Sequence, residues 1–147
     1  MPAGPDALGF VYFAAAKFAG YSAFCRVVIQ PNCEEIASDG VKTPSAWKAG
    51  GVRTGIGLVL GAIVGLGFWK IPYFALGHTL DTPLFFLVLI PVRIAEWALL
   101  LRWIYRDFHF GARQNAFIVA VGIVTSFALD GLGVLAAFIL PGGVWIC

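Results

Sequence analysis

Four ionisable side chains stand in the middle of long apolar segments of the sequence. They are Lys17, Arg93, Glu96 and Asp130. A charged residue at the centre of a lipid bilayer costs about 2.5–3.5 kcal/mol. Four such residues without partners would together cost on the order of 10–14 kcal/mol, which is comparable with the whole stability of a typical domain. We therefore expect these side chains to be paired, protonated or hydrated.

The signs of the four charges balance, and several pairings are compatible with the sequence. Arg93 and Glu96 are three residues apart on one predicted helix, so they can meet on the same face. Lys17 and Asp130 come from different segments and could pair across a bundle. Arg93 could equally reach Asp130, because a guanidinium group suits two-pronged contact with a carboxylate. The sequence does not choose between these partners.

These charges have two interpretations. They could be interhelical contacts that fix how the helices pack. Alternatively, they could form a site for a substrate, an ion or a lipid headgroup, since ionisable residues inside membrane segments often line such paths. Tyr21 belongs to that candidate site, because Lys17, Tyr21 and Cys25 recur every four residues and share one face of a helix.

The composition predicts helices in a membrane. Hydrophobic residues make up 60% of the 147 residues and charged residues 12%, with a mean hydropathy of +0.87. Soluble domains are about half apolar and about a quarter charged. The apolar stretches are long and continuous, as expected for membrane helices. The net charge of only +2 gives no basic field for nucleic acid, so membrane lipids are the predicted partners.

Four segments reach the roughly 20 residues that cross a hydrocarbon core. We place them at about 7–30, 54–76, 83–105 and 115–140, in a single domain of residues 1–147. Short connections favour antiparallel neighbours. The predicted fold class is therefore all-α, a polytopic membrane protein with four transmembrane helices in an antiparallel bundle. Residues 31–53 are predicted to form a cytoplasmic loop.

Basic residues predict the orientation. Seven of them lie in or beside the first and third connections, whereas only Lys70 lies near the opposite side. Cytoplasmic loops carry an excess of Lys and Arg. We therefore expect a multi-pass protein of the cell membrane with both termini on the non-cytoplasmic side. The seven residues are Arg26, Lys42, Lys48, Arg53, Arg102, Arg106 and Arg113.

The second segment carries Gly57, Gly61 and Gly65 at four-residue spacing. Small residues at this spacing permit close approach of two helix backbones. This stripe is either the interface of a homo-oligomer or a packing surface inside one bundle.

Motifs for a cofactor or a metal ion are missing from the sequence. The three cysteines, Cys25, Cys33 and Cys147, form no CxxC pair, and no nucleotide-, haem- or zinc-binding motif occurs. We predict neither a cofactor nor a metal ion, and we assign no catalytic residue.

Three functions remain open, and the favoured one is a small transporter or channel-like protein. In it, Asp130 or Glu96 responds to protons or cations, while Lys17 and Arg93 serve as counter-charges or anion ligands. A membrane-embedded enzyme acting on a lipid or quinone would use the bases to hold its substrate and the acids for proton transfer. A structural or assembly subunit would use the charges to bind a partner helix. Whether the chain is an enzyme stays undecided.

Overall fold

The structure is a computed structural model that describes the backbone of residues 7–37, 41–70 and 81–137, with side chains over 9–37, 41–63 and 89–133. Every regular element in these ranges is helical. In chain order they are α1 (Ala7–Phe24), η1 (Cys25–Ile29), α2 (Gln30–Ile36), α3 (Ala46–Lys70), α4 (Asp81–Ile104) and α5 (Ala112–Ala137). The prediction of an all-α fold is confirmed.

The first three elements form one continuous helix, because both ends of η1 keep right-handed helical dihedral angles. In η1 the helix widens to a π turn, where the Gln30 N–H donates to the Cys25 carbonyl five residues earlier. Pro31 explains this turn. It has no N–H, and in a regular α-helix its ring would collide with the Val27 carbonyl. A wider turn relieves the collision. The helix therefore continues to Ile36, beyond the predicted end near residue 30.

The second long helix, α3, begins at Ala46 rather than near Thr54. The predicted loop over 31–53 is thus wrong in extent, since only the stretch between Ile36 and Ala46 separates the two helices. The predicted loop included Gly50, but this residue lies where α3 touches α1. A Cβ at Gly50 would stand 2.7 Å from the Ser22 backbone nitrogen and would also collide with the Ser22 hydroxyl. Glycine is needed there for close packing.

The other two helices lie close to their predicted positions. α4 starts at Asp81 and continues through Pro91, and α5 starts at Ala112. The predicted ends of the second and fourth segments, 71–76 and 138–140, lie outside the described residues, as do both chain termini.

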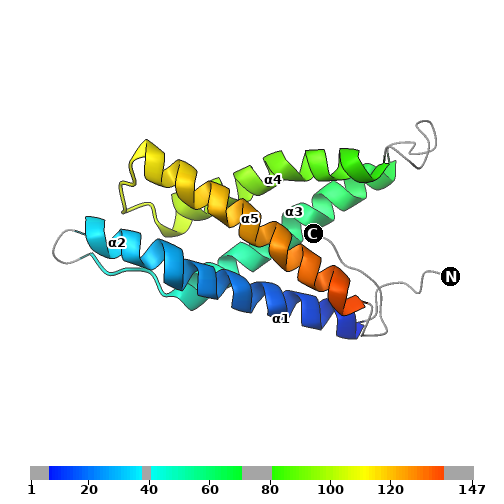
Figure 1. Cartoon of the computed structure of the whole chain (residues 1–147), viewed down its shortest axis with the longest axis horizontal. Coiled ribbons are helices and arrows are strands. Elements are labelled where there is room, and N and C mark those ends of the chain that lie inside the picture. Colours follow the sequence, from blue (N-terminus) through cyan, green and yellow to red (C-terminus); the bar gives the residue numbers. More distant parts are fainter. Residues whose placement is uncertain (1–6, 38–40, 71–80, 138–147) are drawn as a thin grey trace.

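The main contacts form a ring in which each long helix touches two others (Figure 1). α1 packs against α3 and α5, and α4 packs against the same two helices. The chain direction alternates from one helix to the next along the sequence. A core of aromatic and aliphatic side chains fills the half of this ring nearest the α4–α5 loop, including Phe24, Ile29, Trp97, Leu100 and Ile118.

Several charged side chains lie inside the molecule, while many large apolar side chains are exposed on its surface. Within the described ranges, the exposed apolar residues come from all four long helices and include Val11, Val27, Val59, Ile94 and Val124. The buried set includes lysine, arginine, glutamate and aspartate. Water-soluble proteins have the opposite arrangement, with Lys, Arg, Glu and Asp almost never fully buried unless they are paired.

One segment of the described chain, Ala112–Gly133 of α5, is long and apolar enough to cross a membrane. Only 22% of its apolar window is buried inside the molecule. The core helix of a soluble protein would be mostly buried.

Candidate functional site: a buried cluster of charges

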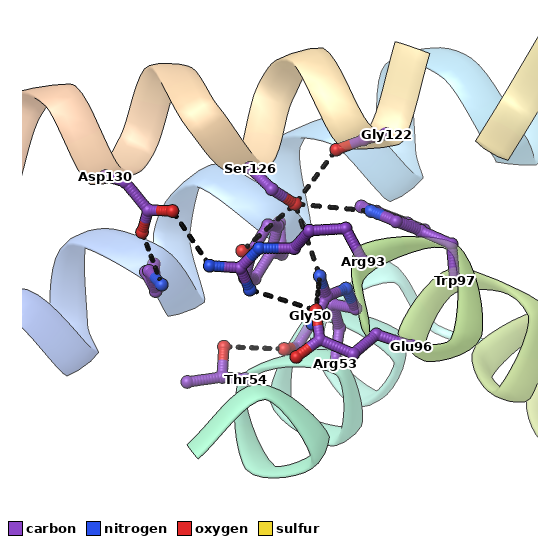
Figure 2. Close-up of polar contacts among 11 residues, drawn as sticks. Gly50, Arg53, Thr54, Arg93, Glu96, Trp97, Gly122, Ser126 and Asp130 are labelled. Carbon is purple, nitrogen blue, oxygen red and sulfur yellow. Dashed lines mark hydrogen bonds and ion pairs between the residues drawn. The ribbon is translucent and has the colours of Figure 1, made fainter. Parts of the chain in front are cut away.

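The structure brings together the five residues that the sequence suggests as a site. Lys17 and Tyr21 come from α1, Arg93 and Glu96 from α4, and Asp130 from α5. None of these residues is more than 4% exposed. The charges therefore meet in the interior, at the level where the four long helices surround one another (Figure 2).

The carboxylates connect the bases in an alternating chain. Asp130 Oδ1 forms an ion pair with Lys17 Nζ at 2.7 Å, and Asp130 Oδ2 accepts a hydrogen bond from Arg93 Nη2 at 2.8 Å. Glu96 Oε2 then accepts from Arg93 Nη1 at 2.9 Å. The alternatives left open by the sequence are resolved, because Arg93 binds both acids and Lys17 binds Asp130 across the helices.

Arg53 of α3 completes this series of ion pairs, and the sequence did not suggest Arg53 as a site residue. Its Nη2 donates to Glu96 Oε2 at 2.6 Å, and the residue is fully buried. Arg53 follows a polar, glycine-containing stretch, so it counted as a loop residue in the orientation argument. The signal that could have found it is Gly57, one helical turn later. A Cβ at Gly57 would stand 3.2 Å from Arg53 Nη1 and 3.6 Å from Glu96 Oε1.

Two aromatic rings hold the guanidinium of Arg53. Its central carbon lies 4.6 Å from the centre of the Tyr21 ring and 4.8 Å from that of the Trp97 ring. A cation over an aromatic face is stabilised by the ring's negative face, by about 2 kcal/mol or more when water is excluded. The two rings meet edge to face at 5.8 Å. Tyr21 thus contributes to the cluster through its ring as well as through its hydroxyl.

Ser126 of α5 is the polar centre on the other side of Arg53. Its Oγ lies 3.2 Å from Arg53 Nη2, 3.2 Å from Trp97 Nε1 and 3.3 Å from the Tyr21 hydroxyl. Ser126 also donates to the Gly122 carbonyl at 2.9 Å. Because a hydroxyl has two lone pairs, it can accept from only two of the three donors at once. Neither Ser126 nor Trp97 was suggested by the sequence, where both look like ordinary helix residues.

Among the described side chains, the buried cluster holds three bases and two acids once Arg53 is included. Lys17, Arg53 and Arg93 pair there with the carboxylates of Glu96 and Asp130. Three N–H donors in the cluster have no protein partner among the described residues, namely Arg53 Nε, Arg53 Nη1 and Arg93 Nε. A buried donor without a partner costs about 1–3 kcal/mol, and more when it is charged. The cluster therefore favours negative charge or water at the Arg53 end.

The glycine stripe of α3 points partly into this cluster. Gly57 is buried against Arg53 and Glu96, as the packing interpretation requires, whereas Gly61 is half-buried. The surroundings of Gly65 lie outside the described side chains.

Metal ligands do not gather in the described part of the chain, where no three His, Cys, Asp or Glu residues come together. Cys25 and Cys33 are both buried and free. No protein-family model matches this chain, and neither a characterised protein nor a solved structure matches it.

Proposed function

We propose that this chain is a four-span membrane protein that acts as a small transporter or channel-like protein for an anionic solute. The membrane part of the proposal is supported by the reversed polarity of the molecule. Among the described residues, five charged side chains are buried, and exposed apolar side chains occur on all four long helices. The α3, α4 and α5 helices have 25, 24 and 26 residues, enough to cross a core that takes about 20.

One observation carries the transport part: among the described side chains, the three bases of the buried cluster outnumber its two acids. An uncompensated charge at the centre of a bilayer is expensive, and such residues commonly mark the path of an ion or substrate. The unpartnered donors of Arg53 and Arg93 supply groups that an anion or its hydrating water would accept from. In this proposal, Asp130 and Glu96 keep the bases apart and set how strongly the anion is held.

The orientation belongs to the same proposal. Arg53 no longer counts among the loop residues, but six basic residues still lie in or beside the first and third connections. The positive-inside rule then keeps both termini on the non-cytoplasmic side.

Anion flux into proteoliposomes tests the proposal. We expect Asp130→Asn and Lys17→Met each to change the rate of chloride or nitrate uptake, because each alters the charge balance of the cluster. Lys48→Met is the matched control for Lys17→Met, since Lys48 is exposed at the start of α3 and loses the same charge. Unchanged flux in both cluster variants, each confirmed as folded by size-exclusion chromatography, would remove the transport proposal.

A structural role is the second candidate, in which the charges fix how the four long helices pack instead of binding a partner helix, and the continuity of the ion pairs favours it. The pairs join α1, α3, α4 and α5 into one connected network. As a scaffold, the protein would be stable alone in detergent and would carry no flux. A membrane-embedded enzyme for a lipid or quinone would need a lateral opening to these residues. The low exposure of the cluster gives that alternative less support.

A further inference from the structure

A second site lies in a cleft between the ends of α4 and α5, away from the buried charges. The cleft has a volume of about 430 Å³, which is within the range of about 300–1,000 Å³ typical of ligand pockets. Its walls combine apolar side chains, including Leu101, Phe108 and Val119, with the guanidinium groups of Arg102 and Arg106.

The aromatic wall of the cleft is preformed. Phe108 and Phe110 stack with ring centres 6.3 Å apart, and Tyr105 packs against both at 6.3 and 6.4 Å. The loop that carries them is closed by the Phe108 N–H, which donates to the Tyr105 carbonyl at 3.0 Å. Asn115 Nδ2 donates to the Phe110 carbonyl at 3.1 Å and so attaches this loop to α5. A ligand would therefore meet a surface that needs little ordering on binding.

The positive charge of the cleft is available to a ligand. Arg102 is exposed. Within the described part of the chain, Arg106 forms an ion pair with Asp107 alone, at 3.4 Å, and the two side chains are 76% and 69% exposed. A pair so exposed contributes little stability, so it does not hold Arg106 strongly. The start of α5 also borders the cleft through Asn115, and a helix N-terminus favours negative charge.

We propose that this cleft binds one anionic phospholipid, with the phosphate between Arg102 and Arg106 and the first part of an acyl chain along Leu101, Phe108 and Val119. Guanidinium groups are suited to phosphate oxygens. A free phosphate would use the arginines but leave the apolar wall exposed. A lipid uses both, and the cleft lies at the end of helices that the proposed function places in the membrane. The inference rests on that membrane location and not on transport.

Native mass spectrometry of the full chain in a neutral detergent tests this assignment. Dioleoyl phosphatidylglycerol is titrated in parallel with dioleoyl phosphatidylcholine, and inorganic phosphate forms a third arm. We expect tighter binding of phosphatidylglycerol than of phosphatidylcholine, and no comparable binding of phosphate. The single substitutions Arg102→Gln and Arg106→Gln should each weaken binding of phosphatidylglycerol about fivefold. This factor corresponds to about 1 kcal/mol per basic residue at an anionic surface.

Arg26→Gln combined with Lys48→Gln is the matched control, because both residues are exposed and lie outside the cleft. This control removes the same two positive charges as the double variant of the cleft, Arg102→Gln with Arg106→Gln. It should keep the preference for phosphatidylglycerol over phosphatidylcholine. Equal loss in the two double variants would overturn the site, as would equal binding of the two lipids. Phosphate binding as tight as lipid binding would show a phosphate site instead. None of these results depends on flux, so the transport proposal is tested separately.

Discussion

Arg53 of α3 donates to Glu96 of α4 across 2.6 Å, the shortest charged contact among the described residues. It links α3 to a network that otherwise joins only α1, α4 and α5. Glu96 Oε2 is shared, because Arg93 Nη1 donates to the same oxygen at 2.9 Å. One carboxylate oxygen thus offsets two guanidinium groups in the interior.

We expect Glu96→Gln to lower the free energy of unfolding by about 3–5 kcal/mol, since removal of one partner leaves buried charges uncompensated. Denaturant titration of the protein in detergent, followed by circular dichroism, measures this loss. Glu35→Gln makes the same chemical change at an exposed position of α2 and should leave the midpoint unchanged. Equal midpoints for the two variants would contradict the importance of the shared oxygen.

Two glycines of α5 should respond in opposite ways to alanine. A Cβ at Gly122 would stand 2.5 Å from Cε2 of Trp97, whereas nothing lies within 4 Å of a Cβ at Gly131. Gly122→Ala should destabilise the protein by about 1–3 kcal/mol, because it forces the buried indole to move. Gly131→Ala should be neutral or slightly stabilising, because alanine favours helix over glycine. Thermal unfolding of the two variants in the same detergent compares them, and equal melting temperatures would contradict this packing.

Ser126→Ala should destabilise the protein more than Thr125→Ala. Both hydroxyls donate to a carbonyl four residues earlier on α5, Gly122 and Val121 respectively. Only Ser126 also lies within hydrogen-bond distance of three buried donors, those of Tyr21, Arg53 and Trp97. The two donors that it accepts from at one time would lose their acceptor at about 1–3 kcal/mol each. Denaturant titration gives the difference between the two variants. A larger loss for Thr125→Ala would contradict the central role of Ser126.

The Cys33 thiol should be inert at neutral pH. Burial raises its pKa from 9.0 to about 12, and the neighbouring Cys25 and Glu34 add to the shift in the same direction. Little thiolate then forms below pH 9, and the thiolate is the species that reacts. Iodoacetamide labelling read by peptide mass spectrometry should leave Cys33 unmodified in the folded protein. Moving the thiol to the next, exposed position with Cys33→Ala and Glu34→Cys should restore labelling.

The same shift gives a direction for stability against pH. The folded state holds the Cys33 proton more tightly than the unfolded state, so this contribution to stability is complete below about pH 9. It is lost as the pH rises from about 9 to about 12. Cys33→Ala should reduce the dependence of the unfolding midpoint on pH in that window, and an unchanged dependence would contradict the assignment.

The sequence predicts the charged cluster better than it predicts its surroundings. Lys17, Arg93, Glu96 and Asp130 are conspicuous because each is a charge in an apolar segment. Their partners could not be chosen, since pairing depends on how helices rotate against one another. Arg53 was missed because it lies in the range 31–53 that was predicted as a loop, although this range includes the start of α3 and close packing against α1 requires Gly50 there.

The shape of the first helix could not be predicted for a different reason. The π turn before Pro31 is a local widening of the helix backbone, and the amino-acid composition of the segment does not predict it. The short polar segment after it resembled a loop, yet Cys33 in that segment is fully buried against the core. Helix ends are set by such local contacts, whereas helix existence follows from long apolar runs.

The pairing of Lys17 with Asp130 determines when the buried ion-pair network can be completed during synthesis of the chain. A ribosome makes α1 first and α5 last, so Lys17 is synthesised well before the carboxylate it contacts. Until α5 emerges, both Lys17 and Arg93 lack Asp130, and only the complete chain closes the network. The ammonium group of the first helix therefore meets its carboxylate partner on α5 only late in translation.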